Sequence, residues 1–128
     1  MGFKTKTRDD YPSTDVEFTA TLREYQNLVK KEAIGYLNKN GSCILSLHVG
    51  WGKSLFSVYL ACKLKFKTLV LLSKMAIVPQ WIDTIQNNTT SKCQFIKTSK
   101  TLIDPECDFY IMNPINVCKL PLDFFKDV

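Results

Sequence analysis

The chain has 128 residues, of which 45% are hydrophobic and 23% charged, enough apolar material for one small globular domain. Its apolar runs are too short to span a bilayer, and no apolar stretch follows the basic N-terminus as a secretory signal requires, so we expect no membrane partner. The five cysteines show no C-x-x-C spacing, which argues against a zinc site and favours a reducing compartment. The net charge of +5 fits either a polyanionic partner or a plain basic surface.

The first third of the chain divides into a polar segment and a helix. Residues 1–20 are polar and turn-rich, and we expect them to form a leader that precedes a domain of residues 21–128. From Leu22 to Leu37, apolar residues recur mostly at three- and four-residue steps, which predicts an amphipathic helix. Asn38-Lys39-Asn40-Gly41 has the residues typical of a helix C-terminus and ends that helix.

Strands and helices then alternate. Residues 42–47 predict a short buried strand, residues 48–52 a glycine-bearing turn and residues 53–64 a helix. A second buried strand is expected at 68–72. A helix is expected at 76–87, where a proline near the start does little harm because its missing N–H would be unpaired anyway.

The last third holds two further strand candidates, residues 94–96 and 108–112. Residues 113–128 include two prolines and are expected to form one or two short helical turns. Strands that are apolar throughout and alternate with helices are typical of a parallel sheet covered on both faces. The predicted fold class is therefore α/β, with a parallel sheet and helices on both faces.

The segment GWGKS, residues 50–54, lies between a predicted strand and a predicted helix, as a triphosphate-binding loop does. Glycines let backbone N–H groups close around phosphates, and the helix start adds a partial positive charge. Lys53 is then expected to reach the β- and γ-phosphates and the Ser54 hydroxyl to bind Mg²⁺. The leading glycine of the full G-x-x-x-x-G-K-[ST] pattern is replaced by Leu47, so the match is partial. The alternative is a tight glycine turn with an exposed lysine.

The candidate nucleotide site extends over both sides of the lysine. It comprises Val49, Gly50, Trp51, Gly52, Lys53, Ser54 and Leu55. Three alternatives stay open for the Trp51 side chain: it lies over the nucleotide, it lies under a partner segment, or it simply packs in the interior.

Four segments resemble, in their order, the motifs of superfamily 2 helicases and translocases of the DEAD/DEAH type. Residues 22–26, LREYQ, resemble the L-R-x-Y-Q element that precedes the phosphate loop, and residues 47–54 resemble motif I, which often lacks the leading glycine. Residues 69–81, ending in Q-W, resemble motif Ia, and residues 108–114 the later strand that commonly reads V-x-T-[PY]. Covering about residues 20–120, the resemblance implies part of a RecA-like P-loop NTPase domain that uses ATP and Mg²⁺.

The resemblance also implies roles for residues outside the loop. Gln26 would read the adenine edge with support from Arg23, and Lys74 and Asn113 would contact the backbone of a nucleic acid, DNA or RNA. Lys74 stands near the family's usual proline and Asn113 in place of its usual threonine. The alternatives are an exposed polar residue on a helix for Gln26 and a solvated loop charge for Lys74.

Hydrolysis requires further groups: a carboxylate for magnesium, a base for water and usually an arginine from a second domain. In the family the first two come from a D-E-x-[HD] strand that follows the segment at Asn113, and this chain has no Asp-Glu pair. We therefore expect the N-terminal part of an ATP-dependent helicase or translocase, inactive alone, whose remainder includes a second RecA-like domain.

Two alternative functions stay open. The chain could be a nucleotide- or nucleic-acid-binding module without ATPase activity, or a small P-loop kinase. A kinase lid is rich in arginine, so the presence of only two arginines in this chain counts against the kinase. Its lysine- and asparagine-rich style is similar to helicases of large DNA viruses. That similarity implies the cytoplasm or nucleus, including a viral replication compartment, or the virion.

Overall fold

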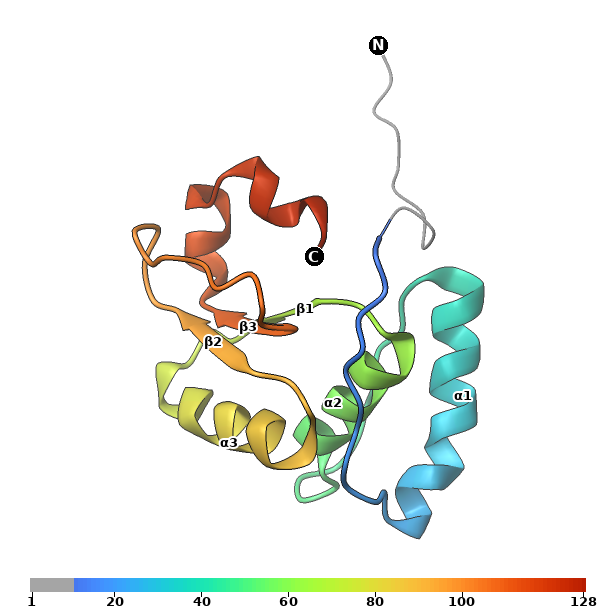
Figure 1. Ribbon diagram of the computed structural model, residues 1–128. Coiled ribbons are helices and arrows are strands. Elements are labelled where there is room, and N and C mark those ends of the chain that lie inside the picture. The colour runs from blue at the N-terminus through green and yellow to red at the C-terminus, as the bar shows by residue number, and fades with distance from the viewer. Residues whose placement is uncertain (1–10) are drawn as a thin grey trace.

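The computed structural model describes residues 11–128, and the elements follow the predicted order (Figure 1). The α-helices are α1 (Glu24–Asn40), α2 (Lys53–Leu64) and α3 (Val78–Asn88). The strands are β1 (Thr68–Leu71), β2 (Cys93–Ile96) and β3 (Phe109–Met112), and the 3₁₀ helices are η2 (Met75–Ile77), η3 (Pro114–Lys119) and η4 (Leu122–Lys126). The first half of the expected leader, residues 1–10, lies outside the described residues.

The helix ends have the local chemistry that the sequence indicated. Gly41 takes a left-handed conformation (φ 74°) after α1 and donates its N–H to the Leu37 carbonyl at 2.9 Å. A glycine pays no Cβ penalty there, so α1 stops at this residue. Pro79 lies in the first turn of α3, where its missing N–H breaks no helical bond.

The sheet is parallel, as predicted, and its strand order is β1-β3-β2. Thr68 and Cys93 both lie opposite Phe109, so β3 is the central strand and β1 and β2 form the edges. All four residues of β3 are buried, which explains its uninterrupted apolar sequence.

Helices cover both faces of the sheet, as predicted, with α-helices on one face and 3₁₀ helices on the other (Figure 1). Phe109 and Ile111 of β3 face α2 and α3, whereas Tyr110 and Met112 face the tail that contains η3 and η4. Helix α1 packs against α2 rather than against the sheet, so α2 is covered on two sides. No helix within residues 11–128 is long and apolar enough to cross a membrane.

The strand predicted at residues 42–47 is wrong. This segment is irregular, and in the described part of the chain it joins no backbone ladder. Leu45 and Leu47 pack on a hydrophobic cluster between α1 and α2, here called the α1–α2 cluster, whose buried residues are Leu22, Ala33, Trp51, Phe56 and Leu60. Ile44 is 94% exposed, so only one side of the segment is covered. A strand also requires a neighbour for its N–H and C=O groups, which the local sequence does not specify.

The leader boundary predicted at residue 20 also requires correction. Val16 is 2% exposed and belongs to the main core, and Phe18 pairs with Thr89 in an antiparallel bridge. The Thr14 N–H donates to the Lys65 carbonyl at 2.8 Å. Residues 14–19 therefore form a strap across the C-terminal ends of α2 and α3 and are part of the domain.

Candidate nucleotide and nucleic-acid site

The loop before α2 has the conformation that its glycines permit. Gly50 and Gly52 are both left-handed, with φ of 82° and 91°, a region that side-chain-bearing residues rarely occupy. The Trp51 N–H donates to the His48 carbonyl at 3.3 Å and closes a tight turn. A Cβ placed at Gly50 would meet no heavy atom within 4 Å, so the space beside this residue is open.

The loop delivers the chain directly into the first turn of α2. The helical bonds begin with the Phe56 N–H donating to the Gly52 carbonyl at 3.0 Å. The N–H groups of Lys53, Ser54 and Leu55 precede that bond and have no partner within the helix. No side chain caps this end and no acidic residue lies in the first turn, so its partial positive charge is available to an anion.

The structure places Lys53 and Ser54 in the first turn of α2. Lys53 is exposed and Ser54 is half-exposed at the start of α2. A hydroxyl oxygen beside phosphate oxygens is the kind of hard ligand that Mg²⁺ prefers, so this donor set fits the ion. Residues 11–128 contain no group of three His, Cys, Asp or Glu side chains that could hold a metal elsewhere.

The structure contradicts one of the two alternatives for Gln26. It is only 1% exposed, so it is not an exposed polar residue on a helix. Its Oε1 accepts the Arg23 N–H at 2.9 Å, and its Nε2 donates to the Trp51 carbonyl at 3.2 Å. The amide therefore points inward to the loop backbone, and adenine recognition by Gln26 stays a prediction.

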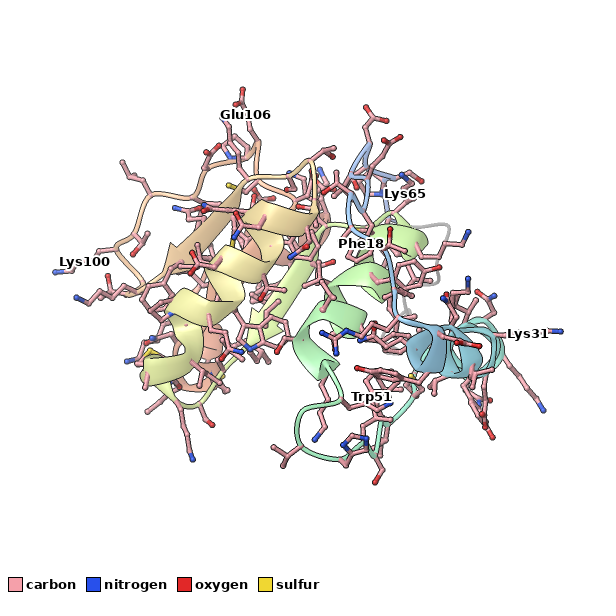
Figure 2. All side chains as sticks on the ribbon, turned by 90° about the horizontal axis from the view of Figure 1, so that it is seen from below. Phe18, Lys31, Trp51, Lys65, Lys100 and Glu106 are labelled. Carbon is pink, nitrogen blue, oxygen red and sulfur yellow. The ribbon has the colours of Figure 1, made fainter. Side chains whose placement is uncertain are left out.

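For Trp51 the structure shows the packing alternative. The indole is 6% exposed and belongs to the cluster between α1 and α2. It makes edge-to-face contacts with Phe56 at 5.0 Å and Tyr25 at 5.6 Å between ring centroids. Figure 2 shows it at the end of α2 opposite Lys65. The ring is thus an anchor for the loop, and only its backbone is available to a ligand.

The remaining residues of the predicted nucleotide site lie around this anchor. Arg23 is exposed, and its Nη1 donates to the Tyr25 hydroxyl at 3.3 Å. Val49 is 96% exposed at the loop apex, whereas Leu55 is half-buried on α2. The structure therefore brings Arg23 and the loop into one region through Tyr25 and Trp51.

Lys74 and Asn113 are brought together at the C-terminal edge of the sheet. They follow the neighbouring strands β1 and β3, in which Leu71 lies opposite Met112. Asn113 donates from Nδ2 to the Ser73 carbonyl at 3.4 Å, and its Oδ1 accepts the Ile115 N–H at 3.0 Å. One asparagine side chain thus ties the two loops, and the exposed Lys74 stands beside this tie.

Sequence reasoning missed two residues of this edge, Lys97 and Asn116. Lys97 follows β2, and its side chain is exposed. The Asn116 Nδ2 donates to the Lys97 carbonyl at 3.3 Å. The position of Lys97 directly after a predicted strand was the available signal. That signal acquires meaning only once β2 is known to pair in parallel with β3, because parallel strands end at the same edge.

Comparisons with known proteins point to viral helicases. No protein-family model matches the chain. It is 33% identical over 93% of its length to "Putative helicase 161L" of Invertebrate iridescent virus 6, and 31% identical over 88% to "Putative helicase 109L" of Invertebrate iridescent virus 3. It is also 36% identical over 65% of its length to "Putative ATP-dependent RNA helicase L396" of Acanthamoeba polyphaga mimivirus.

The similarity to the two iridescent-virus proteins extends along most of the chain, but it covers a minor part of each of the three relatives. The chain spans 28%, 36% and 16% of the lengths of these three proteins. All three come from large DNA viruses, and all three carry a helicase name. The chain is therefore homologous to a part of the proteins named helicases in large DNA viruses.

Proposed function

We propose that residues 50–54 bind the phosphates of ATP with Mg²⁺, as part of a superfamily 2 nucleic-acid helicase or translocase. The observation that carries this proposal is the loop itself. Two left-handed glycines lead into the uncapped N-terminus of α2, with Lys53 exposed at its first residue. Backbone N–H groups would surround the phosphates, Lys53 would pair with the β- and γ-phosphates, and Ser54 would bind the metal.

The proposed path of the nucleic acid lies at the C-terminal edge of the sheet. Lys74 and Lys97 are exposed there, and Asn113 connects the loops that follow β1 and β3. Lysine and asparagine side chains at such an edge suit contacts to phosphate and sugar, which hold a strand without reading its sequence. The proposal therefore covers DNA or RNA as the track.

We further propose that the groups required for hydrolysis come from the remainder of a longer chain, including a second RecA-like domain. The greater length of the relatives supports this proposal. So does the open edge of β1, where a cavity of about 280 Å³ lies beside Val58, Leu69, Leu71 and Trp81. A strand edge that has no partner within residues 11–128 and lies beside an apolar cavity suits the addition of another strand.

The decisive experiment is nucleic-acid-stimulated ATP hydrolysis by the full-length protein. Lys53→Ala should abolish the stimulated rate because it removes the charge opposite the γ-phosphate. Lys63→Ala, at the exposed far end of the same helix, is the matched control and should keep that rate. Hydrolysis that survives Lys53→Ala would refute the assignment of the loop. If the protein binds ATP but does not hydrolyse it in the presence of DNA or RNA, the result would favour the non-ATPase module instead.

A further inference from the structure

A series of aromatic rings joins the strap to the loop before α2. Phe18 lies edge-to-face with Tyr59 at 5.3 Å between ring centroids, and Tyr59 is stacked on Phe56 at 6.2 Å. Phe56 in turn lies edge-to-face with Trp51 at 5.0 Å. These four residues are here called the aromatic row. Figure 2 shows Phe18 toward the end of α2 that holds Lys65, and Trp51 at the opposite end.

The strap end of the aromatic row is fixed to the rest of the domain. Phe18 forms the antiparallel bridge with Thr89, and the neighbouring Thr19 N–H donates to the Asn88 carbonyl at 2.8 Å. The Phe18 side chain packs against both the main core and the α1–α2 cluster. The backbone of Phe18 is therefore held by the C-terminal end of α3, while its ring lies against α2.

The other end of the aromatic row holds the loop on which the proposed phosphate contacts depend. Phe56 is 0% exposed and Trp51 is 6% exposed. In a closely packed interior such rings cannot shift without moving their neighbours. Backbone N–H groups surround an anion only while the loop keeps one conformation. The position of the Trp51 ring therefore affects the phosphate contacts, although the ring itself is turned away from a ligand.

We propose that Phe18 is a positioning residue for the phosphate loop and acts on it through Tyr59, Phe56 and Trp51. This inference rests on the proposed binding of a triphosphate by the loop. The Phe18 ring keeps Tyr59 against Phe56, and Phe56 keeps the Trp51 ring in its place. If the row loosens, the loop spends less time in its binding conformation, and the apparent affinity falls in proportion to that fraction.

The first test measures the affinity of the full-length protein for Mg·ATP, by competition with a ribose-labelled fluorescent ATP well below the unfolding temperature. Phe18→Ala should weaken binding by about three- to tenfold, the range expected for the loss of one aromatic pair. Phe18→Tyr keeps the ring, so it should restore the affinity to within about twofold of the wild type. Wild-type affinity in Phe18→Ala would overturn the inference.

Val16→Ala is the matched control on the same strap. Val16 belongs to the main core, whereas Phe18 packs against both clusters. Val16→Ala should weaken the attachment of the strap but keep the Mg·ATP affinity within about twofold of the wild type. A loss in Val16→Ala as large as that in Phe18→Ala would show that a general loosening of the strap is responsible, and would also overturn the inference.

A double-mutant cycle tests whether the aromatic row carries the effect. Tyr59→Leu keeps an apolar side chain on α2 but interrupts the rings between Phe18 and Phe56. Alone it should weaken Mg·ATP binding about as much as Phe18→Ala, and adding Phe18→Ala should then cost less than about twofold more. Losses that multiply in the double variant would mean that the two residues act independently, against the proposal. Phe18→Leu replaces Phe18→Ala throughout if the alanine variant does not fold.

Failure of this inference is distinguishable from failure of the proposed function. A wild-type protein that does not bind Mg·ATP, or a Lys53→Ala variant that binds it normally, would refute the phosphate site itself. If Lys53→Ala loses binding while Phe18→Ala keeps it, the phosphate site stands and Phe18 has no part in positioning it.

Discussion

The side-chain nitrogen of Gln26 lies where a side chain at Gly52 would begin: a Cβ there would be 2.6 Å from Nε2. Gly52 is also left-handed, with φ of 91°. The backbone conformation thus requires the glycine, and a side chain there would also displace the Gln26 amide from its present position. This pair of residues couples the start of α1 to the start of α2.

Gly52→Ala should therefore destabilise the fold and disable the loop together. A non-glycine residue in this conformation costs about 1–3 kcal/mol, before the clash with Gln26 is included. The control is Gly35→Ala in α1, where an added Cβ meets nothing within 4 Å. This substitution should stabilise the helix by about 0.5–1 kcal/mol. Urea unfolding of both variants measures the two changes. Equal effects at both glycines would contradict the geometry described for the loop.

Removing the core contact of the strap should destabilise the domain. Val16→Ala deletes two buried methyl groups from the main core, and we expect a loss of about 1–3 kcal/mol in the free energy of unfolding. Asp15→Ala, exposed and next in the chain, should stay within about 0.5 kcal/mol of the wild type. Thermal or denaturant unfolding distinguishes them. A neutral Val16→Ala would mean that the strap does not contribute to the folded domain.

The salt dependence of nucleic-acid binding should locate the electrostatic contacts. Lys74→Ala and Lys97→Ala should each lower the slope of log K against log salt by about 1, and together by about 2, because each removes one of the proposed phosphate contacts. Lys92 is the control: it precedes β2 at the other end of the sheet, where it pairs with Glu106 at 3.2 Å. An unchanged slope in the double variant, or a reduced one in Lys92→Ala, would place the nucleic acid elsewhere.

The cysteines should differ widely in their reactivity toward alkylating reagents. Burial raises the pKa of the Cys93 thiol to about 12, with a smaller contribution from neighbouring Cys107, and burial raises the pKa of Cys62 to about 11. The thiolate is the reactive form, so at pH 8 both thiols should react slowly, and their rates should rise as the pH approaches 11–12. Cys118 is exposed and should react first.

Mass spectrometry after brief iodoacetamide treatment at pH 8 provides the measurement. Cys118→Ser should remove the fast-reacting thiol while Cys62 and Cys93 stay unmodified. Rapid modification of Cys93 in the native protein at that pH would contradict its partial burial against the main core.

Local sequence predicted those elements whose chemistry is local. Residues 53–64 were predicted as a helix with the bounds that α2 has, since the loop glycines and the apolar spacing mark its start and its face. The helix ending at Gly41 and the strands near 68–72, 94–96 and 108–112 followed for similar reasons. These features depend on capping, periodicity and apolar runs within about one helix length.

The wrong predictions concern segments whose structure depends on residues far away in the sequence. Residues 42–47 have the composition of a strand, but pairing depends on a neighbour, and the described chain provides a helical surface instead. The strap looked like a leader because Val16 and Phe18 are isolated apolar residues in a polar stretch. Their partners, such as Tyr59 and Thr89, are 41 or more residues away along the chain.

The sequence by itself determined the α/β class, the parallel sheet and a glycine-bearing turn, Gly-Trp-Gly-Lys-Ser, that leads into a helix, because glycine freedom, helix ends and apolar runs are local properties. Only the tertiary structure decided what surrounds that loop. It turned the Gln26 amide inward, buried the Trp51 ring and placed Lys74, Lys97 and Asn113 at the same edge of the sheet. Each of these outcomes depends on which helix or strand packs against another, and no window of neighbouring residues contains that information.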